Sequence, residues 1–194
     1  MIKKKGLLLV ISGPSGAGKG TVCKELLERN PEFKLSVSAT TRAPREGEVD
    51  GESYFFLTKE KFSEMIGQGG FLEYAQIYSN FYGTPKGPVM KYLEEGSDVI
   101  LEIEMQGARQ VKEMYPEAVL IFVLPPSLEE LRNRLTTRGT ETEEQVNERL
   151  STSLEEIKQV KDYNYFIFNE NNKTTESAKI IEDIIVAEKN KASR

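Results

Sequence analysis

The sequence has no histidine, a single cysteine and no long apolar stretch, and each shortage excludes a class of function. Without histidine, the chain cannot use an imidazole as a general base, a metal ligand or a pH-sensitive group. Cys23 alone cannot form an internal disulfide, which suits a reducing compartment, so we expect a cytoplasmic protein. No segment approaches the roughly 20 apolar residues that a membrane span requires.

The charge balance argues against broad binding to polyanions. The 194 residues include 26 Lys and Arg against 31 Asp and Glu, which gives a formal net charge of −5. We therefore expect no nucleic-acid or membrane partner, and any phosphate site must be local. The apolar run from Leu7 to Ile11 is too short for a signal peptide, so we interpret it as a buried strand. The oligomeric state cannot be read from the chain.

Four apolar runs between turn signals predict the strands of a parallel sheet. They read LLLVI, DVILEIE, AVLIFVLPP and YFIF. Helical patterns separate them, at residues 19–29, from about Pro88 to near Gly96, and at 174–188, where an apolar stripe should dock on the core. The alternation predicts a three-layer α/β fold in one domain, residues 5–188.

Two segments do not fit this alternation. Residues of about 36–86 combine aromatic, glycine and basic residues around a short helix, and we interpret them as an insertion that holds a substrate. Residues of about 127–156 are rich in Arg and Glu, with capping boxes at Ser127 and Thr140 that open polar helices. This second segment is too polar for the core and is predicted to be a mobile lid.

The segment GPSGAGKGT, residues 13–21, nearly fits the phosphate-binding pattern G-x-x-x-x-G-K-[ST]. It follows a predicted strand and opens a predicted helix, so backbone N–H groups and the helix dipole would face phosphate oxygens. Lys19 would reach the β and γ phosphates. The alternative, an ordinary glycine-rich turn, is disfavoured by the spacing and the lysine. Gly20 replaces the usual hydroxyl ligand of Mg²⁺, so phosphates and waters would hold the ion, helped by Thr21 or a carboxylate.

Six segments occur together in an order and spacing that resemble the guanylate kinase family, from about Lys5 to Glu188. They read GPSGAGKGT, SVSATTRAPREGEVDGESYFF, FLEYAQIYSNFYGTP, LEIEMQGA, FVLPPS and RGTETEEQVNERL. The resemblance implies a P-loop kinase fold with a parallel central sheet, a small mixed α/β GMP-binding insertion and a helical lid. It also implies Mg²⁺-dependent phosphoryl transfer from ATP to GMP or dGMP, with GKGT as a variant of the loop.

The loop TRAPR carries two arginines, Arg42 and Arg45, that could fork around a monophosphate. The resemblance assigns them this role together with the hydroxyls of Tyr54 and Tyr82. On the loop alone, a solvated basic turn would be the favoured interpretation.

Guanine presents two kinds of donor, N1–H and the N2 amino group, so a selective pocket needs acceptors. The resemblance makes Glu73 the main acceptor and places Ser38, Gly83, Thr84 and Glu104 around GMP. By itself, Glu73 would be interpreted as an ordinary surface acid.

Two acids end the run DVILEIE, where open parallel sheets bind ligands. We expect Glu102 to approach Mg²⁺ through water, with an exposed pair of acids as the alternative. Family members often carry aspartates here, and the extra methylene of Glu102 leaves its approach open.

Arg134 and Arg138 share one face of the lid at a spacing of four residues. A lone arginine pair on a charged helix is usually solvated, but the resemblance implies that both close over ATP together with Arg149. The residues expected to act in catalysis are Lys19, Arg42, Arg134, Arg138 and Arg149. The residues expected to bind ATP are Gly13, Pro14, Ser15, Gly16, Ala17, Gly18, Lys19, Gly20, Thr21, Arg138 and Asn169.

Phosphoryl transfer depends on positioning and positive charge more than on a strong base, which suits a chain without histidine. Two other functions fit the sequence less well. A protein-binding module that uses the GMP pocket is disfavoured because Lys19 and the lid arginines are present. An NTPase with water as acceptor is disfavoured by the GMP-type insertion. Water must be excluded from a kinase, so we also expect the insertion and the lid to close.

Overall fold

The computed structural model describes residues 5–136 and 142–192. Its central sheet is parallel throughout. The strands follow the order β2 (Lys34–Leu35), β7 (Val99–Glu102), β1 (Leu8–Ser12), β8 (Val119–Leu124) and β9 (Tyr165–Phe168). The four apolar runs of the sequence form β1, β7, β8 and β9, as predicted, whereas the two-residue strand β2 carries no comparable run and was not predicted.

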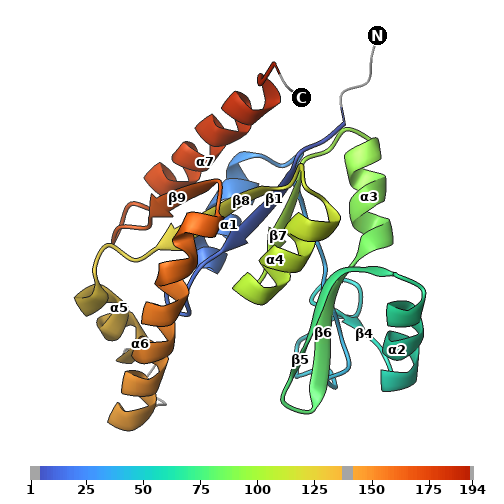
Figure 1. Ribbon diagram of the computed structural model, residues 1–194, viewed down its shortest axis with the longest axis horizontal. Helices are drawn as coiled ribbons and strands as arrows, with labels where there is room; N and C mark the ends of the chain where they lie inside the picture. Colours follow the sequence, from blue (N-terminus) through green and yellow to red (C-terminus); the bar gives the residue numbers. More distant parts are fainter. Residues whose placement is uncertain (1–4, 137–141, 193–194) are drawn as a thin grey trace.

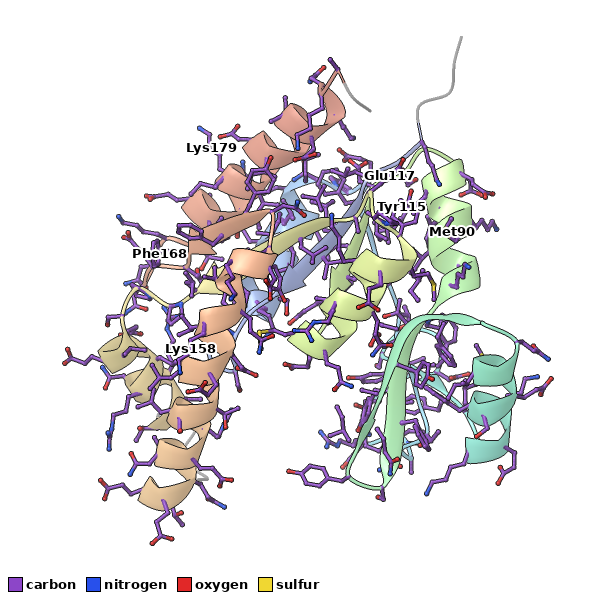
Figure 2. All side chains as sticks on the ribbon, in the orientation of Figure 1. Met90, Tyr115, Glu117, Lys158, Phe168 and Lys179 are labelled. Atoms are coloured by element: carbon purple, nitrogen blue, oxygen red, sulfur yellow. The ribbon has the colours of Figure 1, made fainter. Side chains whose placement is uncertain are left out.

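Helices cover both faces of the central sheet, which confirms the predicted three layers (Figure 1). One face carries α1 (Lys19–Arg29) and α7 (Thr174–Lys189), and the other carries α3 (Lys86–Glu94) and α4 (Met105–Met114). Side chains of β1 pack in both layers, because alternate side chains of a strand point to opposite faces of the sheet. Leu9 and Ile11 join the first layer, and Leu8 and Val10 join the second. Side chains fill both interfaces (Figure 2).

Residues 36–86 form a separate small sheet with its own core. The strand order is β4 (Phe55–Phe56), β3 (Ala39–Thr40), β6 (Asn80–Pro85) and β5 (Phe71–Ile77), with helix α2 (Lys59–Gly67) beside it. The buried Phe62 of α2 stacks on Phe71 with ring centroids 4.3 Å apart. Aromatic side chains thus replace the aliphatic runs of the central sheet, which explains the unusual composition of this segment.

The predicted lid segment contains α5 (Leu128–Thr136) and α6 (Glu143–Ile157), followed by the 3₁₀ helix η1 (Lys158–Asp162). These helices share a small core of their own, built on Leu131, Leu135 and Val146, which the sequence analysis overlooked. The capping box of α6 is formed by Thr142 and Gln145. The predicted box at Thr140 lies outside the described residues.

The small sheet and the α5–α6 pair project from the same end of the molecule, the lower end in Figure 1. The strands β1, β7 and β8 end here, and the helices α1, α4 and α5 follow them in the chain. Ligands of open parallel sheets bind at that edge. Within the described ranges, no helix is long and apolar enough to cross a membrane.

Candidate active site

The loop between β1 and α1 is shaped by its glycines. Gly16 and Gly18 both have φ 88°, a left-handed conformation that disfavours any residue with a side chain. A β-carbon at Gly13 would collide with the carbonyl oxygen of Val123 on β8, so this glycine lets the loop run against the sheet. The predicted phosphate loop therefore has the backbone that its pattern requires.

Lys19 begins α1 and folds back over the loop. Its Nζ donates to the carbonyl oxygens of Gly13 at 2.6 Å and Pro14 at 3.3 Å. The first turn of α1 has no side-chain cap and no acidic residue, so neither a capping side chain nor a carboxylate of this turn competes with an anion for its N–H groups. Loop, helix terminus and ammonium group together form a candidate anion site.

Arg134 of α5 binds protein carbonyls beside the loop. Its Nη1 donates to the Ala17 carbonyl at 3.2 Å, and its Nη2 donates to the Asn169 carbonyl at 2.9 Å and to Asn171 Oδ1 at 2.6 Å. Its Nε pairs with Glu130 at 2.9 Å. The side chain thus anchors the lid helix to the loop, and its charge remains next to the anion site.

Two further side chains reach the loop from the elements around it. Arg149 of α6 donates from Nη2 to Ser15 Oγ at 2.5 Å. Asn169, which follows β9 and is buried, donates from Nδ2 to the Ala17 carbonyl at 3.0 Å. Of the predicted lid residues, Arg134 and Arg149 therefore contact the loop, whereas Arg138 lies outside the described residues.

The carboxylates of Glu102 and Glu156 interact electrostatically with Lys19, and both also interact with Glu104. A β-carbon at Gly20 would stand 3.4 Å from Glu102 Oε1, which places that carboxylate beside the position of the missing hydroxyl. Desolvation raises the pKa of Glu102, with Lys19 opposing the shift and the charge of Glu104 adding to it. Desolvation and then Glu104 raise the pKa of Glu156 on α6. Thr21 is exposed on the same helix end.

Glu104 opens α4 and faces the lid side of this edge. It lines a hollow of about 510 Å³ between α4 and α6, together with Glu156. Glu73 lies instead in the small sheet, packed against α4. Glu104 and Glu73, which are both predicted to lie around GMP, thus belong to different elements. Glu156 could not be found from the sequence, because its place on a charged helix carries no motif.

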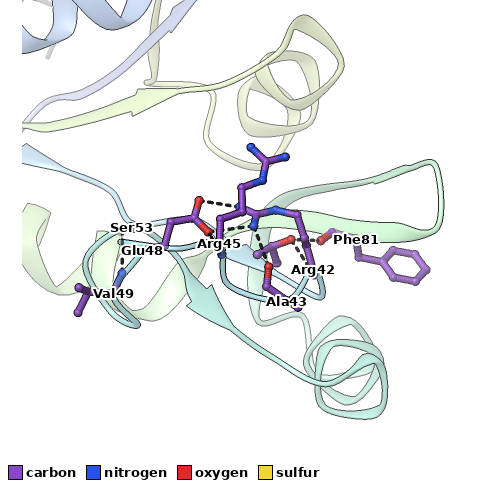
Figure 3. A network of polar contacts seen from close by, with 8 residues as sticks. Arg42, Ala43, Arg45, Glu48, Val49, Ser53 and Phe81 are labelled. Atoms are coloured by element: carbon purple, nitrogen blue, oxygen red, sulfur yellow. Dashed lines mark hydrogen bonds and ion pairs between the residues drawn. The ribbon is translucent and has the colours of Figure 1, made fainter.

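In the small sheet, Arg42 is held by a partner that the sequence analysis did not single out (Figure 3). Its two terminal nitrogens bind both oxygens of Glu48 at 2.8 and 2.9 Å. Glu48 also accepts from the Arg45 backbone N–H at 2.7 Å. Arg42 lies over the ring of Tyr54 at 5.5 Å, and Tyr54 meets Tyr82 edge to face at 6.2 Å. The four predicted phosphate-binding residues are therefore connected: Arg42 joins Glu48 to the two tyrosines, and Arg45 meets Glu48 through its backbone N–H.

The pKa values of this pair reflect the contact. The hydrogen bonds from Arg42 are the main cause that lowers the pKa of Glu48 to about 2. The reciprocal hydrogen bond from Glu48 raises the pKa of Arg42 above its usual value. The guanidinium stays charged and fixed in direction, as a phosphate site requires.

Glu73 of β5 is a buried carboxylate with an ordered partner. Its side chain is 8% exposed, and Oε1 accepts the hydroxyl proton of Thr84 on β6 at 2.7 Å. Desolvation raises its pKa, and the Thr84 hydrogen bonds oppose the shift. A β-carbon at Gly83 would stand 2.7 Å from the Glu73 carbonyl oxygen, so only glycine lets β5 and β6 approach here. Ser38 precedes β3 in the same sheet and is half-buried.

A phosphate loop at the carboxyl edge of a parallel sheet, with a helical lid and a second small sheet at that edge, defines the class of P-loop nucleotide kinases. The guanylate kinase family model matches residues 5–188.

Individual relatives agree with the family match. The chain is 70% identical to guanylate kinase of Clostridioides difficile strain 630, over 100% of this chain and 94% of that protein. It is 55% identical to guanylate kinase of Caldanaerobacter subterraneus subsp. tengcongensis, over 100% and 93%. A crystal structure of guanylate kinase from Anaplasma phagocytophilum matches with a TM-score of 0.77 at 36% identity, covering 100% of this chain and 92% of that one. The chain belongs to the guanylate kinase family.

Proposed function

We propose that the chain transfers the γ-phosphoryl group of ATP to GMP, giving ADP and GDP, and also accepts dGMP. One observation carries the proposal: a phosphate loop and a buried carboxylate beside an arginine–tyrosine cluster lie at one end of one molecule. The reaction needs these two halves, an anion site for ATP and a pocket that selects guanine. The product nucleotides place the reaction in purine nucleotide metabolism and GMP recycling, and we expect it in the cytoplasm.

On the donor side, the loop of residues 13–21 would cradle the ATP phosphates with its N–H groups. Lys19 would release the Gly13 and Pro14 carbonyls and reach the β and γ phosphates, which are stronger acceptors because they are charged. Arg149 already contacts Ser15 of the loop and is therefore within reach of the phosphates. Arg134 would add charge while it anchors α5, and Arg138 and Asn169 would border the adenine.

On the acceptor side, Arg42, Arg45, Tyr54 and Tyr82 would bind the GMP phosphate. Glu73 would accept from the guanine N1–H and N2 amino groups. The remaining residues expected around GMP are Ser38, Gly83, Thr84 and Glu104. AMP offers no matching donors and would leave the buried carboxylate without partners, which disfavours it.

Magnesium would enter with ATP. Within the described part of the chain, no group of three or more His, Cys, Asp or Glu residues forms a metal cage. A site with few protein ligands fits Mg²⁺, because this ion keeps most of its waters and binds mainly through substrate phosphates. Glu102, whose Oε1 lies 3.4 Å from the position of a β-carbon at Gly20, would accept hydrogen bonds from such waters, and Thr21 would help. The bound ion would neutralise charge on the β and γ phosphates.

Transfer would then depend on positioning. Lys19, Arg42 and Arg149 would offset the negative charge of the two nucleotides, so that the GMP phosphate can approach the γ-phosphoryl group in line. The lid of about 127–156 and the insertion of about 36–86 would close over both substrates within the single domain of residues 5–188. Closure excludes water, the competing acceptor.

The test is ADP formation from MgATP with GMP, dGMP, AMP, CMP, UMP or no acceptor, with Lys19→Ala as the blank. We expect turnover with GMP and dGMP alone, with equal amounts of ADP and GDP. ATP hydrolysis that does not need GMP would replace the proposal with an NTPase. Absence of turnover with every acceptor would point to a binding module.

A further inference from the structure

The Glu73 carboxylate stands between two elements that belong to different parts of the fold. On one side, Thr84 of β6 donates its hydroxyl proton to Oε1 at 2.7 Å. On the other side, the first turn of α4 approaches Oε2. The residue is 8% exposed, so protein atoms surround most of it. The residue of α4 that contacts the Glu73 carboxylate therefore limits where this carboxylate can lie.

That residue is Gly107. A β-carbon at this position would stand 2.6 Å from Glu73 Oε2, 3.0 Å from Cδ and 3.2 Å from Cγ. Contacts of this length do not persist, so an alanine would force the Glu73 side chain or α4 to move. Gly107 is not among the described glycines with positive φ, so its backbone conformation does not require glycine. Glycine is also a poor helix former, and α4 includes it within its first turn.

The helix is not free to withdraw, because Gln110 fixes α4 to β5. The Gln110 side chain accepts from the Tyr74 backbone N–H at 3.1 Å and donates to the Tyr74 carbonyl at 3.0 Å. Residues three apart share a helix face, so Gln110 and Gly107 both meet β5, where Tyr74 directly follows Glu73. A side chain at position 107 would therefore displace the carboxylate more easily than the helix.

We infer that Gly107 is a specificity-determining position, whose missing side chain makes the space in which the Glu73 carboxylate selects guanine. This inference rests on the proposed function, because it assigns a role within the GMP pocket. Gly107 touches no nucleotide in this account and is a positioning residue for Glu73. Its substitution should change GMP recognition, and it should leave ATP binding intact.

The test compares Gly107→Ala with Gly67→Ala. Gly67 is also helical, at the end of α2, and a β-carbon there would meet no atom within 4 Å. We expect Gly107→Ala to raise the KM for GMP roughly ten- to a hundredfold, as expected for a displaced binding group. The KM for ATP and the melting temperature should stay at the wild-type values, and Gly67→Ala should match wild type in all three.

The same substitution made in a Glu73→Asp protein distinguishes displacement of the carboxylate from a general loss of structure. Glu73→Asp withdraws the carboxylate from Gly107 by one methylene, so adding Gly107→Ala to it should raise the KM for GMP much less than in the wild type. If Gly107→Ala alone fails to fold, recovery of folding in the Glu73→Asp background supports the same steric account, and failure in both backgrounds overturns it.

Three results would also overturn the inference: an unchanged KM for GMP, equal rises for GMP and ATP, or the same factor in both backgrounds. The proposed function fails separately, if the wild-type protein shows no GMP-dependent ADP formation at all.

Discussion

In the loop after β1, the groups proposed to bind a nucleotide belong mainly to the backbone, whereas in the small sheet they belong to side chains. Gly16 and Gly18 set the direction of the loop through their own φ angles. Arg42 and Glu73 instead depend on partners, Glu48 and Thr84 respectively, that hold them in place. A backbone site is thus fixed locally by its glycines. A side-chain site needs support from several separate positions, so we expect it to fail when that support is removed.

The comparison predicts its largest effect at Lys19, the side chain that is proposed to reach the β and γ phosphates of ATP. Lys19→Ala should lower kcat at least about 10²–10³-fold, the usual loss when a charge that stabilises the transition state is removed. Because the acceptor site is separate, GMP binding should persist. A coupled assay of ADP release measures the loss. Lys24→Ala, an exposed lysine further along α1 that pairs weakly with Glu28 at 3.8 Å, is the matched control and should behave as wild type.

The next largest effect is expected at Glu73. Glu73→Gln should lower kcat/KM for GMP about 10²–10³-fold and reduce discrimination against AMP, because the amide mismatches the guanine donors. Steady-state kinetics with both acceptors measure this change. An unchanged preference for GMP over AMP would show that another residue selects the base.

The same variant should not lose stability at neutral pH. Desolvation raises the pKa of Glu73 above its usual 4.5, so the fold carries a penalty for the ionised form that appears as pH rises through the raised pKa. Removing the charge removes this penalty. In thermal melts, the melting temperature of the variant relative to the wild type should be higher at pH 8 than at pH 5. A relative increase at pH 5 only would contradict this expectation.

A moderate effect is expected at Glu48, which touches no substrate in this account. Glu48→Gln weakens the two hydrogen bonds that orient Arg42, so the KM for GMP should rise about tenfold while the KM for ATP stays unchanged. Glu46→Gln, an exposed acid of the same loop, is the control and should leave both constants unchanged. If the KM for GMP falls instead, Glu48 competes with the phosphate and does not position Arg42.

The smallest effect is a pH dependence at the same pair. Arg42 lowers the pKa of Glu48 from 4.5 to about 2, so the pair stabilises the fold fully above pH 4.5 and loses this contribution as pH falls toward 2. The stability difference between wild type and Glu48→Gln should therefore shrink between pH 5 and pH 2.5. Denaturant titrations at several pH values measure it, and a constant difference would contradict the pairing.

The same contrast explains how much the sequence could predict. The strands β1, β7, β8 and β9, the helix of residues 19–29 and the phosphate loop follow from local apolar runs and glycine spacing, and the structure confirms them. The roles of Arg42 and Glu73 came from a family resemblance, since an arginine pair or a lone acid carries no local signal.

What the sequence analysis missed depends on contacts between distant positions. Gly107 and Glu73 lie 34 positions apart in the chain, and only the packing of α4 on β5 brings them together. The core of the lid was overlooked because Leu131, Leu135 and Val146 are diluted by charged neighbours on two short helices. Strand β2 has only two residues and no apolar run, so pairing with β7 is all that defines it.

We propose that the donor and acceptor sites are built separately, and the decisive experiment measures the binding of each nucleotide to two variants. Calorimetric titrations of Lys19→Ala and Glu73→Gln with GMP and with MgATP should give opposite losses. We expect Lys19→Ala to bind GMP normally and to lose affinity for MgATP, whereas Glu73→Gln should bind MgATP normally and lose affinity for GMP. If either variant loses both nucleotides, or if Glu73→Gln binds GMP as well as wild type does, the account is contradicted.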